Sequence, residues 1–413
     1  IHNNLNIIIM CPAALKDATW KPSINNWVDD RRIANNIIYI SLDSPNLVTD
    51  FDIAIKSVSI NSQLLFLIDE CHIFTSSLVD ETSNRRIVYT QLLNTLRNHN
   101  AYLVCLTATP VVNRVEELVY LFNLLRPDTF HSKEDIFLEM FTNSLNGALK
   151  NKHIFCKRIT GLVSYFESVR KRDLPDTREQ IIQIEMTSGQ LATYAYAERE
   201  EMKSRAGGYK QTTIGMCNFA PPLQIYKQGG YSVASLIENA TAEQLHEMSP
   251  KFTDIIARIE KSKRTNVVHA SFVESTIEPF EQYLKRAGYI EYSGTKKDTK
   301  AYAIVTGKTR ARDRMIILEA FNSNNNMYGQ QIKVLVISDA FLMGVTLNFA
   351  ENIFMLNFHW NMMKKIQGFG RIARLTTHKN LPENERFVNQ IIYVSIRTGG
   401  ITVDQLLEKT AKQ

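Results

Sequence analysis

The stretch FLIDECHIF, residues 66–74, runs from apolar residues into two adjacent carboxylates and a histidine. An apolar run of this kind is typical of a buried strand in an α/β sheet. At the carboxyl end of such a strand, a nucleotide hydrolase needs one carboxylate to hold Mg²⁺ through its water shell and one to polarise the attacking water. The stretch therefore predicts an α/β fold with Asp69 and Glu70 in a hydrolytic site.

Similar apolar runs recur outward from this stretch, at intervals that suit alternating strands and helices. They lie at residues 6–10, 36–40, 64–68 and 102–106, and again at residues 266–270, 302–306, 333–337, 353–356 and 389–394. More polar stretches with helical spacing, such as residues 89–98, separate them. Because the runs are apolar throughout, we expect two parallel sheets that are buried on both faces.

A charged segment that contains a proline, VRKRDLPDTRE, indicates a domain boundary near residue 170. Beyond it, residues 188–203 have the pattern of a helix, and residues 206–250 mix Gly, Pro, Tyr and Gln irregularly. We therefore expect three parts: a first lobe over residues 1–170, a linker and mainly helical insertion over 171–250, and a second lobe over 251–413. The second sheet is expected to start near residue 251.

The composition limits the class of protein. With 413 residues and 44% hydrophobic content, the chain can bury a sizeable core. Its formal net charge of +6 favours nucleic acid as a partner. Five widely spaced cysteines without a CxxC pair argue against a disulfide framework and a zinc site, and predict a reducing, intracellular compartment. No apolar run approaches the roughly 18 residues of a membrane span, so we expect a soluble protein without a membrane partner.

The run LTATP, residues 106–110, ends the strand that follows the carboxylate strand along the chain. Its two hydroxyls, on Thr107 and Thr109, are expected to lie near the two carboxylates, where they can relay the state of bound phosphates into backbone movement. Threonine is common at strand ends, so a purely structural role is an equal alternative for this run taken alone. Its position after DECH favours the functional interpretation.

The run QGFGRIARL places Gln367, Arg371 and Arg374 at positions i, i+4 and i+7, which is one face of a helix. Two guanidiniums a turn apart can reach a phosphate as an arginine finger does. The alternative is a solvated basic helix face. The two glycines argue against it, because each costs a helix about 1 kcal/mol relative to Ala.

Two further runs in the second half of the chain place polar residues close to the end of a predicted strand. ISDAFLMGVTLNFAENIFML, residues 337–356, predicts strand, turn and strand, with Gly344 allowing close backbone approach and Thr346 offering a polar contact. VTGKTRARDR, residues 305–314, contains TGKT but has Tyr302 where a phosphate-cradling loop needs Gly. We therefore expect it to begin a basic patch on a loop and helix start.

The order of these motifs resembles the superfamily 2 DExH-box ATPases, close to the Swi/Snf-like branch, over nearly the whole chain. The motifs are CPAALKDATWKPSINNW, LIDECH, LTATP, VTGKTRARDR, ISDAFLMGVTL and QGFGRIAR. Shorter elements, including MTSGQLATYAYAERE, CNFAPP and MSPKF, look like the transcription ATPases of large cytoplasmic DNA viruses. These are nucleoside triphosphate phosphohydrolase I and the small subunit of the early transcription factor.

The resemblance implies two RecA-like lobes that bind ATP and Mg²⁺ between them. In the first lobe it implies that Asp69 holds Mg²⁺ largely through water, Glu70 positions the attacking water, and His72 couples hydrolysis to DNA. Thr107 and Thr109 are implied to link the two lobes.

From the second lobe, the resemblance implies that Gln367, Arg371 and Arg374 meet the γ-phosphate, while Gly344 and Thr346 line the cleft. The residues that match nucleic-acid-contacting segments are Pro12, Ala13, His269, Ser271, Gly307 and Lys308. His269 and Ser271, at a strand end, are equally typical of core or capping residues.

The resemblance also exposes one departure. The family's GxGKT loop precedes the CPAAL segment, whereas this chain starts without Met inside a strand-like run and does not contain the loop. We expect that the loop lies upstream of residue 1; the alternative is a degenerate ATPase.

The predicted function is a DNA-dependent ATPase motor of viral transcription, which translocates on or remodels double-stranded DNA at early promoters or at termination. RNA is an alternative substrate. The implied partner is a viral RNA polymerase or a larger transcription factor subunit, in the virion and the host cytoplasm. Two other functions stay open: a strand-separating helicase or remodelling motor, and a catalytically inactive DNA-binding scaffold.

Overall fold

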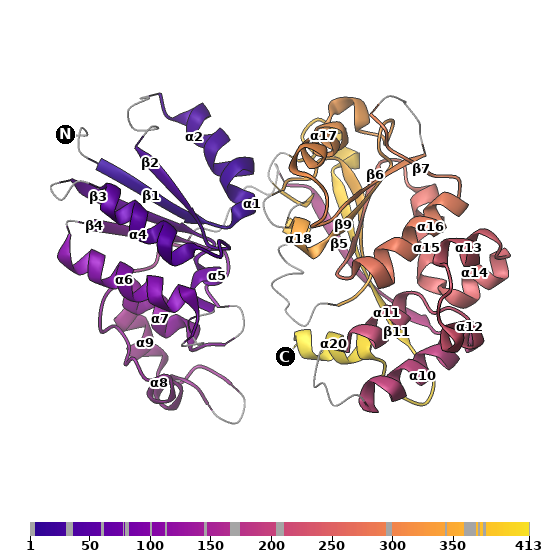
Figure 1. Cartoon of the computed structure of the whole chain (residues 1–413), viewed down its shortest axis with the longest axis horizontal. Coiled ribbons are helices and arrows are strands. Elements are labelled where there is room, and N and C mark those ends of the chain that lie inside the picture. The colour runs from indigo at the N-terminus through magenta and orange to yellow at the C-terminus, as the bar shows by residue number, and fades with distance from the viewer. Residues whose placement is uncertain are drawn as a thin grey trace. The chain divides into compact units, whose positions relative to one another are not determined.

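A computed structural model of the chain describes residues 5–29, 36–58, 62–76, 78, 82–99, 101–111, 114–143, 147–165, 174–203, 210–294, 300–342, 345–358, 369–370, 372–374 and 377–412. The chain divides into two compact units, Ile1–Glu167 and Ser168–Gln413, and each has its own parallel sheet (Figure 1). The α/β fold class with two parallel-sheet lobes is therefore confirmed. Over these described ranges, every helix is too short or too polar to cross a membrane.

The first unit contains a four-stranded parallel sheet. Its strand order is β2 (Ile37–Ser41), β1 (Leu5–Cys11), β3 (Gln63–Asp69) and β4 (Ala101–Leu106). The helical segments are α1 (Ala13–Leu15), the π-helix η1 (Lys16–Trp20), α2 (Lys21–Trp27), α4 (Leu47–Ser57), α5 (Cys71–Ser76), α6 (Asn84–Asn98), α7 (Glu117–Leu125), α8 (Glu134–Phe141) and α9 (Lys152–Ile159). The core of the unit packs against the sheet.

The strand β3 is held in place by the apolar residues that predicted it. Phe66 and Ile68 are completely buried and pack with Phe51 of α4 and Phe74 of α5. Parallel pairing sets Asp69, the last residue of β3, opposite Leu106, the last residue of β4. The DECH and TATP runs therefore begin at the same edge of the sheet.

The strand β4 departs from the expectation of burial on both faces. Tyr102, Val104 and Leu106 are 56%, 41% and 40% exposed, whereas the residues between them are partly buried. The exposed side chains alternate along β4, so one of its faces is open to solvent in the described part of the chain. Its apolar sequence did not reveal this, because apolar residues on both faces read as full burial.

The second unit contains a seven-stranded parallel sheet. Its strand order is β5 (Asp176–Glu185), β11 (Phe387–Ile396), β10 (Ala350–Met355), β6 (Thr265–Ala270), β9 (Val334–Ser338), β8 (Ala301–Val305) and β7 (Ile290–Glu291). The central strand β6 is buried along its whole length. Val267 faces one apolar core and Val268 faces a second one on the opposite side of the sheet.

The expectation that this sheet starts near residue 251 is wrong, because β5 already belongs to it. The sequence of β5, DTREQIIQIE, has few apolar residues, and most of its side chains are exposed. It is an edge strand that pairs along ten residues with β11 alone. An edge strand whose side chains are mostly exposed does not need an apolar sequence. For this reason the polar sequence of β5 was interpreted as part of the linker.

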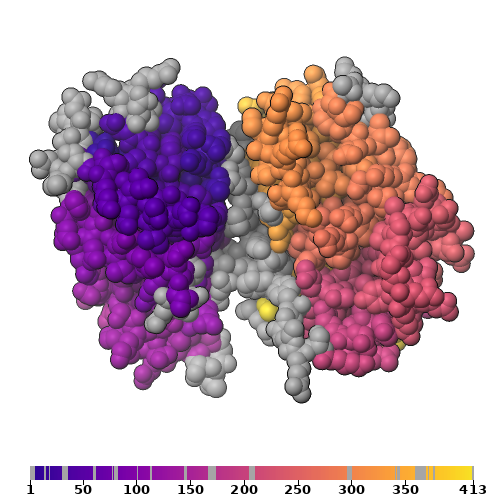
Figure 2. Space-filling view, viewed as in Figure 1, coloured from indigo at the N-terminus to yellow at the C-terminus, as the bar shows by residue number. Residues whose placement is uncertain are grey.

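The helices of the second unit are α10 (Ser188–Lys203), α11 (Gln211–Asn218), α12 (Leu223–Gln228), α13 (Val233–Glu238), α14 (Ala242–Met248), α15 (Pro250–Lys261), the π-helix η3 (Val273–Ile277), α16 (Glu278–Arg286), α17 (Ala311–Asn322), α18 (Asp339–Leu342) and α20 (Val403–Lys412). The helix predicted over residues 188–203 is observed with those bounds. Figure 2 shows α10 to α14 as a continuous part of this unit's surface. Apolar residues of α10 and α11 pack together with Val403 of α20.

Candidate active site and nucleic-acid interface

The two predicted carboxylates lie where β3 turns into α5. Asp69 ends the strand, and Glu70 forms the turn with a φ of +49°. This left-handed conformation is uncommon for a residue with a side chain, and such residues cluster at functional sites. The Glu70 N–H donates to Asp69 Oδ1 at 2.9 Å. The turn thus fixes both carboxylates at the carboxyl edge of the sheet, where open α/β sheets bind their ligands.

The sequence interpretation missed one residue of this site, Trp20. Its indole Nε1–H donates to Asp69 Oδ2 at 2.8 Å. Trp20 ends the π-helix η1, and single-turn π-helices are rare and frequent at functional sites. The available signal was an aromatic N–H donor within the CPAALKDATW motif, since a buried indole N–H usually needs a partner. Trp20 therefore orients the Asp69 carboxylate.

Pro12 and Ala13, which were predicted to contact nucleic acid, directly follow β1 at the same edge of the sheet. Pro12 is buried and Ala13 is exposed. The Ala13 N–H donates to Asp43 Oδ2 at 3.1 Å. This hydrogen bond fixes the backbone after β1, and a role in nucleic-acid contact stays a prediction.

His72 joins the DECH run to the TATP run. Its Nδ1 lies 2.8 Å from Thr107 Oγ1, 3.4 Å from Thr109 Oγ1 and 3.3 Å from Glu70 Oε2. The Thr109 N–H also donates to Thr107 Oγ1 at 3.0 Å. Hydrogen bonds therefore join His72 to both threonines, and the Glu70 carboxylate lies 3.3 Å from the same ring nitrogen.

Burial determines the charge of His72. The imidazole is only 4% exposed, and this desolvation lowers its pKa to about 4 even though the charge of Asp69 acts in the opposite direction. His72 is therefore neutral at pH 7. Its 3.3 Å contact with Glu70 is therefore made by a neutral ring and not by an imidazolium.

We expect the free energy of unfolding to fall as the pH falls from 6.5 to 4. Burial lowers the pKa of His72 and of His378 from 6.5 to about 4, so in this window the unfolded chain binds a proton that the folded chain excludes. The loss is about 3 kcal/mol per histidine. Denaturant unfolding measured across this window should have a shallower pH dependence in His378→Gln. The exposed control His131→Gln should keep the wild-type slope, and an unchanged slope in His378→Gln would contradict the assignment.

The carboxylates fit a magnesium ion held mainly through water. Among the residues that the structure describes, no three His, Cys, Asp or Glu side chains gather as a metal cage. Mg²⁺ usually keeps several waters and binds one or two carboxylates plus substrate phosphates. Each Asp69 oxygen accepts one hydrogen bond, from Trp20 or from Glu70, and a carboxylate oxygen has a second acceptor site for a metal-bound water. When bound, the ion supplies neutralisation of phosphate charge.

In the second unit, the predicted site residues Arg374 and Thr346 are in contact. Arg374 Nη1–H donates to Thr346 Oγ1 at 2.9 Å, and its Nε–H donates to the Gly370 carbonyl at 3.1 Å. Asn322, at the end of α17, donates to the Thr346 carbonyl at 2.9 Å and accepts from the Asn348 N–H at 2.8 Å. Asn322 was missed, and it fixes the loop that carries Thr346.

Three other predicted residues, Gly344, Gln367 and Arg371, lie outside the described residues. Their roles are therefore carried forward as predictions. Arg374 is the member of the arginine set whose contacts the structure describes.

The carboxyl ends of β6 and β9 hold a polar group built on Asp339. His269 Nε2 lies 2.8 Å from Asp339 Oδ1, and the Ser271 hydroxyl donates to the same oxygen at 3.2 Å. The two strands are neighbours, which explains why these residues meet. His269 is only 4% exposed, whereas Ser271 also lines a cavity. The contacts make His269 a support for Asp339 and leave Ser271 at the surface.

That cavity brings together Ser271 and Lys308, which were predicted separately to contact nucleic acid. It has a volume of about 600 Å³ and is lined by Gln211, Thr212, Met216, Tyr226, Ser271, Phe272, Val273, Glu274, Ser275 and Lys308. Gln211 and Thr212, at the start of α11, were missed, because nothing in their sequence connects them to β6. The insertion therefore contributes to the same surface as the predicted residues.

The TGKT run forms a turn before α17, where a loop and a helix start were predicted. The Thr306 N–H donates to Thr309 Oγ1 at 2.9 Å, and the Lys308 N–H donates to Thr306 Oγ1 at 3.2 Å. Gly307 and Lys308 are exposed at the tip, directly before α17. The Lys308 residue is thus exposed in the loop before α17, and the basic patch stays a prediction.

Comparisons with known proteins match both halves of the chain. Residues 2–228 match the SNF2-related domain, and residues 250–376 match the helicase conserved C-terminal domain. The chain is 22% identical over 530 residues to a putative ATP-dependent RNA helicase of Acanthamoeba polyphaga mimivirus, covering 100% of this chain and 65% of that protein. It is 23% identical over 429 residues to nucleoside triphosphatase I of Melanoplus sanguinipes entomopoxvirus, covering 90% of this chain and 63% of that protein.

The chain thus spans slightly less than two thirds of the length of these two curated relatives. Among solved structures, the crystal structure of the C-terminal part of the Fun30 ATPase domain aligns with a TM-score of 0.42 and 11% identity. The alignment covers 58% of this chain and 90% of that one.

Proposed function

Since the chain belongs to the SNF2-related domain family, we propose that it is the motor of a nucleic-acid-dependent ATPase. The observation that carries this proposal is that His72 Nδ1 lies 3.3 Å from the Glu70 carboxylate and 2.8 Å from the Thr107 hydroxyl. A carboxylate in contact with a histidine that is hydrogen-bonded to a second strand end suits a general base whose action must be relayed elsewhere. The contact of Arg374 with Thr346 in the second unit is a separate support.

We propose a division of chemical work between the two sets of residues. Glu70 orients and polarises the water that attacks the γ-phosphate, and Asp69 holds the waters of Mg²⁺. Arg374, with Gln367 and Arg371, neutralises the charge that develops on the phosphate. Neither set provides both functions, so both are expected to serve the same ATP molecule. Hydrolysis then changes how the two units act on nucleic acid.

The proposed substrate is double-stranded DNA, and the proposed setting is viral transcription at early promoters or at termination. The net charge of +6 and the viral relatives support it. In that setting the partner is a viral RNA polymerase or a larger transcription factor subunit, in the virion and host cytoplasm. A strand-separating helicase acting on RNA is the second candidate, because one relative is named a putative RNA helicase.

ATP hydrolysis by the full-length protein tests these alternatives. Turnover that rises with duplex DNA supports the DNA motor, and turnover that rises only with RNA supports the second candidate. Unwinding of a forked substrate without a partner protein would support strand separation over translocation. Turnover no higher than that of a Glu70→Gln control, with any nucleic acid, would contradict the ATPase proposal and support the inactive scaffold.

Lys308→Ala is expected to weaken nucleic-acid binding about equally for all sequences. A lysine that contacts a phosphate releases a counterion on binding, so its loss should reduce the slope of log affinity against log salt by about 1. Fluorescence anisotropy over a salt series measures this slope. Lys203→Ala, an exposed lysine on α10, is the matched control. A wild-type slope in Lys308→Ala would remove Lys308 from the interface.

A further inference from the structure

A cavity within the insertion lies outside the motifs to which roles were assigned, and we call it the insertion cavity. It has a volume of about 450 Å³ and lies among α10, α12, α13 and α14. Figure 1 shows the last three of these helices grouped together in the second unit. The lining is mostly apolar and includes Ala220, Pro222, Ile225, Leu236, Ala240 and Met248. A mostly apolar cavity of this size is typical of a binding site.

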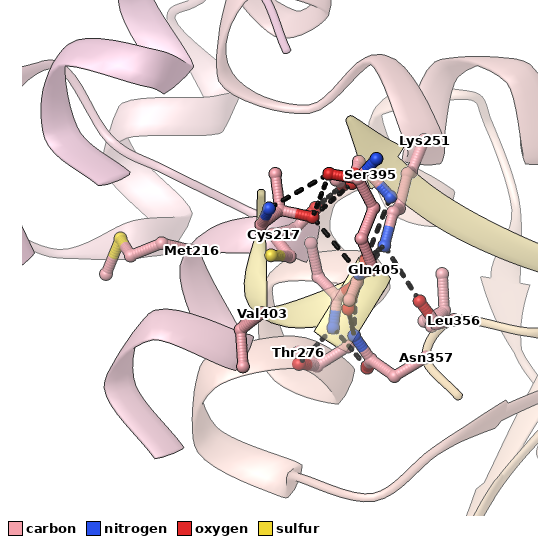
Figure 3. Close-up of polar contacts among 12 residues, drawn as sticks. Met216, Cys217, Lys251, Thr276, Leu356, Asn357, Ser395, Val403 and Gln405 are labelled. Atoms are coloured by element: carbon pink, nitrogen blue, oxygen red, sulfur yellow. Dashed lines mark hydrogen bonds and ion pairs between the residues drawn. The ribbon is translucent and has the colours of Figure 1, made fainter. Parts of the chain in front are cut away.

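A buried polar cluster lies beside the insertion cavity. We define it as Asn218, Lys251, Asn357 and Asp404. Lys251 and Asp404 have no exposed side-chain surface, and their Nζ and Oδ2 atoms are 2.5 Å apart. Figure 3 shows Lys251 and Asn357 pointing toward one another. Removing two ions from water is costly, so such a pair needs directional hydrogen bonds that fix it in one geometry.

The hydrogen bonds of the buried polar cluster join distant parts of the second unit. Lys251 Nζ donates to Asp404, to Asn218 Oδ1 at 3.1 Å and to the Leu356 carbonyl at 2.9 Å. Asn357 Nδ2 donates to Asp404 at 2.9 Å. Asn218 ends α11, whereas Lys251 and Asp404 lie in the first turns of α15 and α20. The insertion is therefore fixed to the sheet unit from inside.

Two further hydrogen bonds lead from the cluster to the insertion cavity. The Ser249 hydroxyl donates to the Asn218 carbonyl at 2.5 Å, and the Ala220 N–H donates to the Met248 carbonyl at 2.9 Å. Ala220 and Met248 line the cavity and are 1% and 3% exposed, so they form its floor. Because this floor is hydrogen-bonded and adjoins the cluster, the cavity keeps its shape without a ligand. Binding to such a preformed site costs little ordering.

The rim of the insertion cavity is acidic. Glu247 lines the cavity, and Glu243 lies one turn before it on the same face of α14. Glu238 ends α13, three residues after the cavity-lining Ser235. Glu238 and Glu243 are exposed, and neither forms an ion pair with any residue of the described ranges. These carboxylates are therefore available to a cation of a ligand.

Glu247 is held at the cavity by the start of α10. Its Oε2 accepts from the Gly189 N–H at 3.1 Å. A Cβ at position 189 would lie 2.8 Å from this oxygen, so the glycine permits the contact. Among the described residues no donor contacts the other oxygen, Oε1. The carboxylate is thus positioned with one oxygen available for a further partner.

The local charge is opposite in sign to that of the whole chain. Residues 211–250 contain three glutamates and one lysine, whereas the chain has a formal net charge of +6. The lysine is Lys227, and its Nζ lies 4.8 Å from the ring centroid of Tyr196. An acidic rim repels phosphates and attracts lysine and arginine. The charge therefore favours a basic protein segment over nucleic acid as the ligand.

We propose that the insertion cavity is a docking site for a partner protein. The partner inserts a large apolar side chain, such as Leu, Phe or Met, and places a lysine or arginine of the same segment against Glu247 and Glu243. Burial of the apolar side chain supplies most of the affinity, and the acidic rim supplies orientation and selectivity. This inference goes beyond the proposed ATPase function and does not depend on it.

Selection of random short peptides displayed on phage, with the full-length protein as target, tests the proposal. The enriched peptides are expected to contain a large apolar residue next to Lys or Arg. Ser235→Trp should weaken their binding about 10-fold or more, because the indole covers the apolar contact that supplies most of the affinity. Ala234→Trp is the matched control, since Ala234 is an exposed residue of the same helix that does not line the cavity.

Glu247→Gln tests the charge separately from the apolar contact. Gln can still accept the Gly189 N–H, so the variant loses only the charge. The enriched peptides should bind about two- to fivefold more weakly, as expected for an exposed ion pair, and added salt should weaken wild-type binding more than variant binding. Glu291→Gln, an exposed glutamate of β7, is the control. Wild-type affinity and salt dependence in Glu247→Gln would overturn the basic partner.

Other outcomes would also overturn the proposal. One is a selection without any peptide whose binding is lost in Ser235→Trp, and another is enrichment of acidic or purely polar peptides. Binding of the uncharged dye Nile red to the wild type but not to Ser235→Trp, without such peptides, would assign the cavity to a small apolar ligand.

Two controls keep these outcomes interpretable. Circular dichroism establishes that each variant is folded, and Asn239→Trp, at another exposed residue of the lining, replaces Ser235→Trp if that variant does not fold. ATP turnover stimulated by nucleic acid should be unchanged in Ser235→Trp. Failure of docking is thereby distinguished from failure of the ATPase function.

Discussion

Replacing Glu70 with Gln is expected to lower kcat for ATP by about 10²- to 10⁴-fold, the contribution typical of a general base. Gln keeps the size of the side chain and the backbone N–H that donates to Asp69. It removes the negative charge that polarises the attacking water.

Steady-state hydrolysis at saturating nucleic acid measures the effect, and nucleotide binding should be retained. Glu139→Gln on α8 is the matched control, since Glu139 is an exposed glutamate of the same unit. The control should keep wild-type turnover. If Glu70→Gln also keeps it, the catalytic base lies elsewhere and the assignment of the DECH turn is wrong.

Replacing Arg374 with Ala is expected to lower hydrolysis by about 10³-fold or more, as the loss of an arginine finger does. The guanidinium stabilises charge that develops on the phosphate in the transition state, so the effect should appear in kcat and not in nucleotide binding. The structure gives Arg374 a hydrogen bond to Thr346, and that hydroxyl loses its donor in the variant.

Single-turnover hydrolysis and an independent nucleotide-binding measurement separate the two effects for Arg374→Ala. Arg286→Ala is the control, because Arg286 is an exposed arginine near the end of α16 in the same unit. A folded Arg374→Ala variant that hydrolyses ATP at the wild-type rate would refute the arginine-finger role. A loss of binding with normal turnover of the bound fraction would assign Arg374 to substrate affinity.

The sequence predicted the apolar strands, but it missed the polar edge strand β5 and the open face of β4. Every residue of β6 is buried, so its run is apolar throughout and easy to recognise. Most residues of β5 are exposed, and its polar sequence was read as a linker. The exposed face of β4 was missed for the opposite reason, because Tyr102 and Val104 are apolar yet lie on the open side.

In the candidate site, too, some contacts were predicted from the sequence and others were missed. Motif spacing predicted that Thr107 lies near the DECH turn, because strand pairing brings the ends of neighbouring strands together. It did not predict the contact of Trp20 with Asp69, 49 residues away along the chain. Such contacts depend on how helices pack, which local periodicity does not encode.

Lys251 and Asn218 lie in the MSPKF and CNFAPP elements, which the sequence had marked as resembling viral ATPases without giving them a role. The hydrogen bonds of these two residues show what the two elements do in the structure. Asn218 donates to Thr276 and Asn357, and its carbonyl accepts from Ser249. The two elements therefore supply buried polar side chains that hydrogen-bond to one another in the interior of the second unit.

The ion pair between Lys251 and Asp404 also has a consequence for the order of folding. During synthesis the ribosome releases Lys251 long before Asp404, which follows it by 153 residues. Until then the ammonium has no anion and is kept out of the interior by its hydration. The second unit therefore cannot complete its core before Asp404 has been synthesised, and until then its nascent form stays partly open, a state that invites aggregation or chaperone binding.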